Sequence, residues 1–256
     1  MQKWLNDLYA VILKNGFNPD GGSSGGGSGG GSGGVLVGNY LGDTYTDEQK
    51  QAIANGSFDG LNIGDYWIIN DITWRIADFD YYYNVGDTAF TKHHLIIVPD
   101  SNLYNDQINE VNRTNGGFLG SVLAQNLRNG CTYFFNAFGE AFIPYHKFRY
   151  SNGVTDGVTS SWTWTSMCVG VMTEEQVYGN SIWGAGNGFD VGTQKTQFRL
   201  FSLDKTKINT GNGYWLSNIK SSTNFCCVGS EGDPRNEGAS KVLGIRLFAC
   251  LIGDPE

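Results

Sequence analysis

The sequence predicts an α+β fold dominated by β structure, with one globular domain and long loops, and three observations support this class. Short β-prone runs recur along the chain and are bounded by turn residues. Aromatic residues make up 14% of the 256 residues and glycine occurs 37 times, whereas only 16% are charged, a balance typical of β-rich, loop-rich exterior domains. The sequence shows no repeat of solenoid or propeller period, so we expect a single domain over residues 35–256.

The first predicted element is an amphipathic helix within residues 1–20. Apolar side chains recur at helical spacing over residues 1–15, Gly16 suits a helix C-cap, and Pro19 follows it. Such a short helix with a large apolar face must dock on something. It could dock on its own domain, but we expect an anchor on another subunit or on a capsid or tail shell. The expected contact residues are Trp4, Leu5, Leu8, Tyr9, Val11 and Ile12.

Residues 21–34 read GGSSGGGSGGGSGG and predict a flexible tether, because this composition cannot pack a core. We expect such a tether where the segments before and after it contact different neighbouring structures. The segment also resembles an engineered linker, and the sequence leaves that alternative open.

The globular domain begins with a predicted short helix and a tight hairpin. Thr46 and Gln49 have the spacing of a capping box, and Asn55-Gly56 suits the end of that helix. Two β-prone runs then flank Asn70-Asp71, which predicts a hairpin that carries two core tryptophans. The two runs and their tryptophans are residues 63–69 with Trp67 and residues 72–77 with Trp74.

Further along the chain we expect a buried strand at 95–98, a helix at 118–128 that ends at Asn129-Gly130, and a second short helix at 132–138. Beyond Gly139 the sequence predicts short strands separated by long loops. Their ranges are 142–150, 162–171, 197–203, 213–216, 225–228 and 242–251.

Charge and targeting signals limit the partners. The 17 basic and 25 acidic residues give a net charge of -8, which repels phosphate backbones, so nucleic acid is not an expected partner. No apolar run approaches the roughly 18 residues of a membrane helix, and no signal peptide is visible. A chain made in the cytoplasm and composed like an exterior protein is expected on a virion surface after release by lysis.

The five cysteines include no C-x-x-C pair and are irregularly spaced, which fits neither a zinc site nor an ordered disulfide framework. We therefore expect reduced, mostly buried thiols. They are Cys131, Cys168, Cys226, Cys227 and Cys250.

The sequence offers no residues that predict catalysis, a metal or a cofactor. His93 and His94 are adjacent on a predicted strand, so their side chains should point to opposite faces. There is no G-x-S-x-G elbow and no phosphate-binding loop, and a Cys/His dyad that uses His146 is the one nucleophile left open. Glu174 and Glu175 fit the first turn of a helix, where the helix dipole explains them fully.

One acidic loop also falls short of a calcium site. Residues 229–238 carry three carboxylates between glycine and proline, without the alternating spacing of an EF-hand. We expect a solvated loop there.

Aromatic residues with polar neighbours are the strongest indication of a binding surface. Rings beside Gly, Asn, Ser and Thr are typical of recognition surfaces when taken as a set, although for any single ring filling the core is the more common role. The residues of this candidate surface are Tyr81, Tyr82, Tyr83, Trp162, Trp164 and Trp183.

From about residue 56 to 253 the chain resembles an uncharacterised domain family of phages and prophages of Gram-positive gut bacteria. The shared motifs are G-D-Y-W at 64–67, W-R-I-A-x-F-D at 74–80, T-K-H-H at 91–94, V-P-D at 98–100, V-Y-G at 177–179, Y-W-L-S at 214–217 and G-I-R-L-F-A at 244–249. Ser217 replaces the family's Arg and Leu247 its Pro, which puts a specific site near the C-terminus in doubt. The family has no established catalytic residues to transfer.

The closing segment is also similar to the last strands of C-type-lectin-like and sulfatase-modifying-factor-like folds, a likeness that does not fix function. The calcium loop and Trp-Asn-Asp signature of sugar-binding C-type lectins are missing.

These resemblances imply a C-type-lectin-like head on a virion surface protein, either a capsid decoration or a head fibre, and not an enzyme. We expect it to be a homo-oligomer that contacts other virion proteins through residues 1–15 and binds a host-surface or mucosal glycan. A tail-tip receptor-binding protein is the alternative, and a glycan-cleaving enzyme is a third interpretation.

Overall fold

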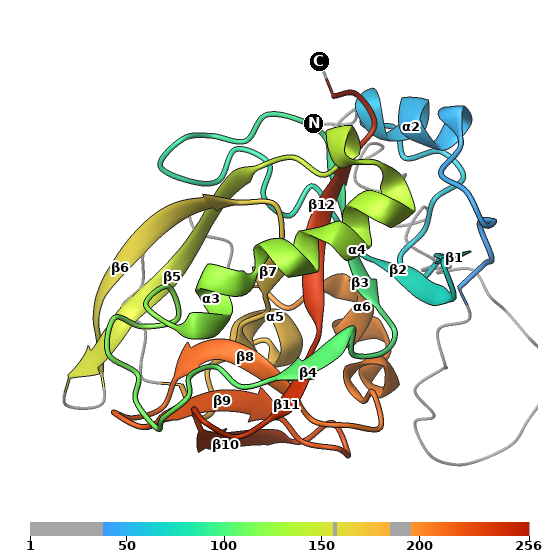
Figure 1. Cartoon of the computed structure of the whole chain (residues 1–256). Helices are drawn as coiled ribbons and strands as arrows, with labels where there is room; N and C mark the ends of the chain where they lie inside the picture. The colour runs from blue at the N-terminus through green and yellow to red at the C-terminus, as the bar shows by residue number, and fades with distance from the viewer. Residues whose placement is uncertain (1–37, 156–157, 185–195, 256) are drawn as a thin grey trace, which may run out of the picture.

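A computed structural model describes residues 38–155, 158–184 and 196–255 of the chain. The predicted anchor helix, with Trp4, Leu5, Leu8, Tyr9, Val11 and Ile12, and the Gly/Ser tether both lie outside the described residues. Within the described part the fold is α+β and rich in β structure, with two five-stranded sheets and one long two-stranded hairpin (Figure 1). No helix in those ranges is long and apolar enough to cross a membrane.

The first sheet contains the main apolar core. Its strand order is β1-β2-β3-β12-β7, and all neighbours are antiparallel. β12 and, after His94, β3 are apolar runs, and both strands are buried at every position, as expected for central strands. The strands are β1 (Tyr66–Ile69), β2 (Ile72–Phe79), β3 (His94–Pro99), β7 (Gly170–Val171) and β12 (Leu247–Ile252).

The predicted hairpin is confirmed as β1 and β2. Asn70 and Asp71 both have positive φ, 53° and 60°, as a two-residue turn of the favoured twist requires. The register places Trp67 opposite Trp74, and both indole rings are fully buried. Local turn chemistry and alternation were therefore sufficient to locate this element.

The second sheet has the order β10-β9-β8-β11-β4, in which β8 and β11 are parallel and the other neighbours are antiparallel. Its strands are β4 (Tyr104–Asp106), β8 (Tyr214–Ile219), β9 (Asn224–Val228), β10 (Pro234–Gly238) and β11 (Leu243–Ile245). The long hairpin is formed by β5 (His146–Thr155) and β6 (Val158–Met167), and Figure 1 shows that it extends beyond the two sheets.

The observed helices match the sequence-based predictions near residue 50 and differ from them further along the chain. The capping box of Thr46 and Gln49 is present, and the helix that it begins ends at Asn55. The range 197–203, predicted as a strand, is helical from residue 199, so that prediction was wrong. The helical elements are α2 (Asp47–Ala54), α3 (Val122–Asn126), α4 (Arg128–Phe138), η1 (Glu140–Phe142), α5 (Glu174–Tyr178), α6 (Arg199–Leu203) and η2 (Lys205–Ile208).

The predicted stop at Asn129-Gly130 was also wrong, because α4 continues through both residues. A Cβ at Gly130 would lie 2.2 Å from the end of the Leu247 side chain, so any larger residue there would have to displace this side chain of β12. Figure 1 shows α4 crossing in front of β12, and the rings of Phe134 and Phe138 lie against Trp74. Tertiary packing overrides the local signal at this point.

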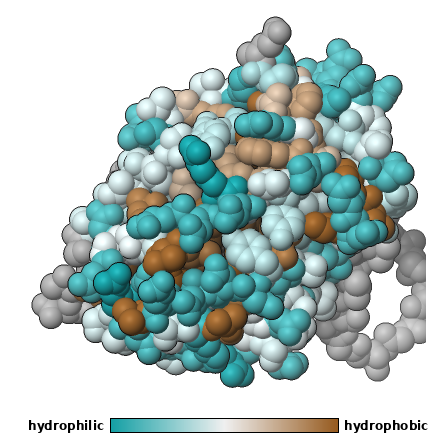
Figure 2. Space-filling view, viewed as in Figure 1, coloured by the Kyte–Doolittle hydropathy of each residue, from teal (hydrophilic) through white to brown (hydrophobic). Residues whose placement is uncertain are grey.

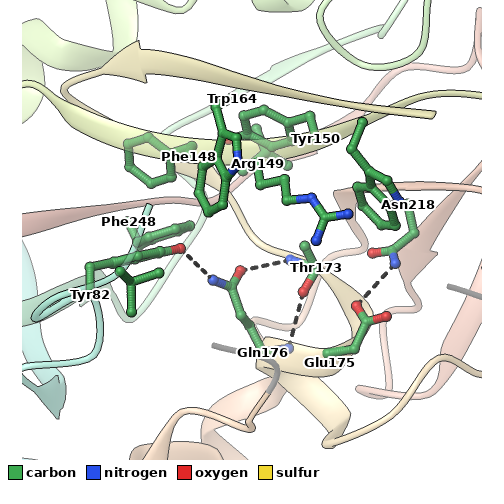
Figure 3. A pocket seen from close by; sticks show the side chains of 13 residues that line it. Tyr82, Phe148, Arg149, Tyr150, Trp164, Thr173, Glu175, Gln176, Asn218 and Phe248 are labelled. Atoms are coloured by element: carbon green, nitrogen blue, oxygen red, sulfur yellow. Dashed lines mark hydrogen bonds between the residues drawn. The ribbon is translucent and has the colours of Figure 1, made fainter. Parts of the chain in front are cut away.

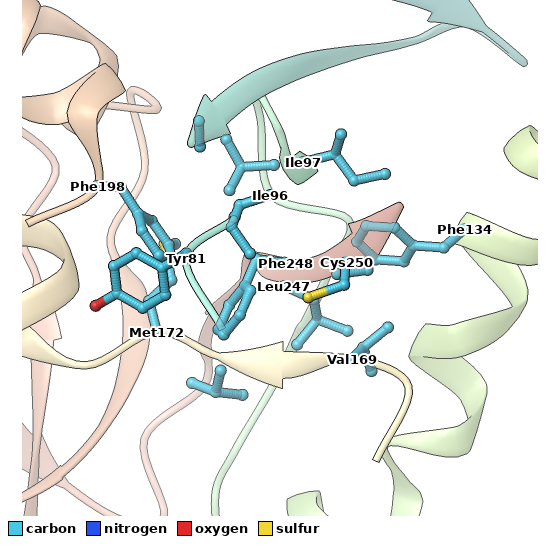
Figure 4. Packing of buried hydrophobic residues seen from close by; sticks show 14 of the residues in the cluster. Tyr81, Ile96, Ile97, Phe134, Val169, Met172, Phe198, Leu247, Phe248 and Cys250 are labelled. Atoms are coloured by element: carbon cyan, nitrogen blue, oxygen red, sulfur yellow. The ribbon is translucent and has the colours of Figure 1, made fainter. Parts of the chain in front are cut away.

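The core is completed around β12. Figure 4 shows Leu247, Phe248 and Cys250 of this strand beside Ile96 and Ile97 of β3. Tyr81 and Phe198 lie on one side of the cluster and Phe134 on the other. Residues far apart in the sequence thus share one apolar interior.

The expectation that the cysteines are reduced thiols was wrong for two of the five. Cys131 of α4 and Cys168, just after β6, form a disulfide with their Cα atoms 6.3 Å apart. Cys226, Cys227 and Cys250 are buried free thiols. The sequence separation of 37 between Cys131 and Cys168 concealed the pair, because their approach depends on how α4 docks beside the β6–β7 turn.

Candidate pocket of the long hairpin

A pocket lies where the β5–β6 hairpin faces α5 and β8. Six of its thirteen lining residues are aromatic, and amide, guanidinium and carboxylate groups supply the polar part (Figure 3). The lining residues are Tyr82, Val85, Phe148, Arg149, Tyr150, Trp162, Trp164, Val171, Thr173, Glu175, Gln176, Asn218 and Phe248.

The hairpin supplies two half-buried tryptophans. Trp162 and Trp164 are two residues apart on β6, so their side chains project from the same face of the strand. Arg149 lies directly opposite Trp164 in the register and shares that face. Its guanidinium lies 4.1 Å from the Trp162 ring centroid, and Figure 3 shows it pointing into the pocket toward Thr173 and Asn218.

The N-terminus of α5 forms the opposite side. Thr173 caps the helix, and its backbone N–H donates to the Gln176 side-chain carbonyl at 2.9 Å. The amide nitrogen of Gln176 donates to the Tyr82 hydroxyl at 2.8 Å. One capping side chain therefore fixes both the start of the helix and the position of an aromatic wall residue.

A hydrogen-bond network holds the Glu175 carboxylate at the pocket. Asn218 of β8 donates to it at 3.1 Å, and the Ser181 hydroxyl donates to its other oxygen. Burial alone raises the pKa of Glu175, but hydrogen bonds from Ser181 and Asn218 outweigh that effect, so the pKa lies below its ordinary value. The pocket therefore contains an ionised carboxylate at neutral pH.

The neighbouring Glu174 has a structural role. Its side chain is fully buried and accepts the backbone N–H groups of Ile182, Trp183 and Gly184 at 2.7 to 3.2 Å. Its own backbone N–H donates to the Asn218 side chain at 2.7 Å. The expectation that the helix dipole explains both glutamates fully was wrong, because one folds a loop and the other lines a pocket.

The structure brings three of the six predicted aromatic residues together, namely Tyr82, Trp162 and Trp164. Tyr81 is only 4% exposed, and its hydroxyl donates to the Thr196 carbonyl at 2.7 Å, so its assignment to a ligand surface was wrong. Its ring packs in the core because α6 and the segment before it cover that turn.

The other two predicted rings lie elsewhere. Tyr83 stacks on His93 at 4.8 Å between ring centroids. Trp183 is 40% exposed and donates to the Pro234 carbonyl at 2.9 Å. Neither lines the pocket that collects the remaining three.

Sequence reasoning missed the polar half of the pocket, which consists of Arg149, Thr173, Gln176 and Asn218 together with Glu175. The capping-box spacing of Thr173 and Gln176 was a usable signal, since it places the start of a helix. Arg149 and Asn218 had no such signal, because only the packing of β5 and β8 against α5 brings them to one place.

The histidines do not form a reactive centre in the described residues. His93 and His94 both approach Asp80, with Nδ1 to carboxylate distances of 2.8 and 3.8 Å, although the sequence suggested opposite faces. His146 Nε2 lies 3.4 Å from Cys250 Sγ, and both side chains are buried. Burial, with His94 nearby, lowers the pKa of His146 to about 3, and burial raises that of the Cys250 thiol. Both groups are therefore neutral, unlike an activated thiolate pair.

Comparison of the chain with protein-family models, with curated proteins and with solved structures found no match.

Proposed function

We propose that this chain is a glycan-binding surface protein of a bacteriophage particle, either a capsid decoration or a head fibre, whose head has a C-type-lectin-like architecture. The observation that carries the binding part is the pocket of the β5–β6 hairpin, in which tryptophan and tyrosine rings stand beside amide, guanidinium and carboxylate groups. The virion assignment rests on the predicted anchor helix, the tether and the family resemblance of the sequence.

The pocket chemistry suits a saccharide. A pyranose presents C–H groups on one face and hydroxyls around its edge, so it is recognised by an aromatic face with fixed hydrogen-bonding groups at the rim. Trp164 supplies a half-buried ring, while Asn218 and Glu175 are held in place by their own hydrogen bonds. Such preorganised groups lose little entropy when a ligand binds.

The same geometry favours binding over cleavage. Glycosidases of the common type need two carboxyl groups on opposite sides of the scissile bond. Among the lining residues that the structure describes, Glu175 is the one carboxylate, and Ser181 and Asn218 hold both of its oxygens. We therefore propose a binding role without a cofactor.

The C-type-lectin-like architecture is supported by the place of the C-terminal strand and of the loops. β12 pairs with β3 in the first sheet, and the stretch between β6 and β8 contributes Val171 of β7 and the N-terminal turn of α5 to the pocket. In lectin-like folds the ends of the domain similarly lie in the sheet while the loop region binds the ligand.

The binding proposal is tested with the full chain on an immobilised panel of bacterial and mucosal glycans. Trp164→Ala should lower the affinity for the bound glycan by about tenfold, the loss of one stacked ring. Trp183→Ala is the matched control, because this tryptophan is exposed outside the pocket, and it should leave affinity unchanged. Equal effects of the two substitutions, or no binding by the wild type, would reject the proposal.

The location is tested by electron cryo-microscopy of purified particles. Density for the chain on the capsid is expected for a decoration or head fibre. Density at the distal tail would instead support the tail-tip alternative. A chain absent from particles would contradict both assignments.

A further inference from the structure

A second groove lies between α4 and β4, on the side of the molecule that faces the viewer in Figure 1. It shares no lining residue with the hairpin pocket. All of its lining side chains carry a polar group. They are Tyr104, Asp106, Asn129, Thr132, Tyr133 and Asn136.

Two tyrosine rings form the aromatic part of the groove. Tyr104 of β4 and Tyr133 of α4 are nearly parallel, with an interplanar angle of 13° and ring centroids 6.1 Å apart. Both are half-buried, so part of each ring stays accessible. Burial, with Asp106 nearby, raises the pKa of Tyr104 to about 12, so its hydroxyl remains protonated and can donate a hydrogen bond.

The polar part of the groove comes from one face of α4. Thr132 and Tyr133 lie three and four residues after Asn129, and Asn136 lies four and three residues after them, which places all of them on one side of the helix. The opposite side, with Phe134 and Phe138, packs on the core. Asn129, Thr132 and Asn136 on the groove face are exposed, whereas Tyr133 is half-buried and also packs against the core.

The residue types on this face are unfavourable for a helix. Asn and Thr both have lower helix propensity than Ala, because their short polar side chains compete with the helical backbone. Gly130 in the same helix is explained by its close approach to Leu247, but Asn129, Thr132 and Asn136 are exposed and meet no such constraint. Their presence is accounted for if their side-chain groups bind a ligand.

Charge restricts the ligand class. Asp106 is the one charged residue among the described groove residues, and the whole chain has a net charge of -8. Phosphate-bearing and acidic ligands are therefore repelled. Figure 2 shows hydrophilic residues separating small apolar patches on this face, which suits a hydrated polar ligand better than an apolar protein partner.

We propose that this groove is a second saccharide site that takes a neutral oligosaccharide. A pyranose face lies against the rings of Tyr104 and Tyr133, and sugar hydroxyls bond to the amides of Asn129 and Asn136 and to the Asp106 carboxylate. The site is independent of the hairpin pocket. Together they make the head bivalent, so that a branched or dense glycan surface engages both sites with increased avidity.

Isothermal titration of the full chain tests the groove, with Trp164→Ala present to weaken the hairpin pocket. The probes are three neutral hexasaccharides: maltohexaose, cellohexaose and chitohexaose. At least one should bind the Trp164→Ala protein, and adding Tyr133→Ala should weaken that binding by about tenfold. Adding Tyr145→Ala, a control at a 54% exposed tyrosine outside both sites, should leave it unchanged.

A second variant separates binding from folding. Asn136→Ala removes one groove amide at an exposed helical position and inserts a better helix former, so the melting temperature should not fall while hexasaccharide affinity does. The proposal is overturned if none of the three hexasaccharides binds the Trp164→Ala protein. It is equally overturned if Tyr133→Ala and Asn136→Ala both leave the affinity unchanged.

Discussion

The β1–β2 and β5–β6 hairpins each carry two tryptophans, but only the first pair is buried completely. Trp67 and Trp74 face each other across β1 and β2, and both are 0% exposed. Trp162 and Trp164 follow each other on β6 and are half-buried at the pocket. The tryptophans of the first hairpin are therefore part of the core, whereas those of the second line a candidate binding surface.

The difference lies in what covers each hairpin. Phe138 of α4 packs edge-on against both Trp67 and Trp74, with ring centroids 5.6 and 5.7 Å away. The tryptophan-bearing face of β6 instead looks across the pocket toward the polar N-terminal turn of α5. A ring on a strand becomes core only when another element supplies an apolar face to pack on it.

The largest expected difference between the two hairpins is the loss of unfolding free energy when one of their tryptophans is removed. Trp74→Ala removes a fully buried ring and should lower the free energy of unfolding by about 3 to 5 kcal/mol. Trp164→Ala, at a half-buried ring, should cost under about 2 kcal/mol. Urea denaturation followed by circular dichroism gives both values. Equal losses would show that the second hairpin is as much core as the first.

The disulfide joins the helix that covers the first hairpin to the end of the second, so reduction should loosen their connection. Closing the loop between Cys131 and Cys168, 37 residues apart, contributes about 3 to 4 kcal/mol in the chain-entropy description. Urea midpoints with and without dithiothreitol measure this contribution. A Cys131→Ala, Cys168→Ala double variant should be insensitive to the reductant, and a wild type that is equally insensitive would contradict the link.

Acid should destabilise the buried root of the second hairpin. His94 on β3 and His146 on β5 have pKa values lowered by burial to about 4 and about 3, whereas an unfolded histidine titrates near 6.5. The unfolded chain therefore binds more protons, and stability that is complete above about pH 6.5 is lost as the pH falls toward the folded values.

The slope rises as the pH falls below 6.5 and approaches about 1.4 kcal/mol per pH unit for each histidine while the pH stays above its folded pKa. Urea unfolding at several pH values between 6.5 and 4.5 measures this slope. The variant His146→Gln should lose the part of the slope that His146 contributes and keep the part that His94 contributes. A stability that stays flat over this interval would mean that the two side chains are not buried in the neutral form.

The smallest expected effect concerns the outer face of α4, the helix that covers the first hairpin. Asn129→Ala should raise the free energy of unfolding by about 0.5 kcal/mol, because alanine is the better helix former and the side chain is exposed. Gln125→Ala, at an exposed position of α3 that already has a good helix former, is the matched control. A loss of stability in the Asn129 variant would assign its amide a structural role.

Local chemistry was sufficient for part of this fold. The capping box of Thr46 and Gln49, the Asn70-Asp71 turn and the apolar run of β3 were all predicted and confirmed, since each depends on neighbours within a few residues. The stop at Asn129-Gly130 and the strand at 197–203 failed. In both places the chain follows packing on distant residues and not its local preference.

The sequence by itself determined the β-rich class, the first hairpin with its tryptophans, and the aromatic residues from which a binding surface could be drawn. Only the tertiary structure decided which rings remain accessible, which cysteines pair, and which polar groups meet them. Periodicity and turn signals act over a few residues, whereas the hairpin pocket joins residue 82 to residue 248 and the groove joins β4 to α4. These residues come together because the whole core is buried, and that burial depends on contacts between distant parts of the chain that no local pattern contains.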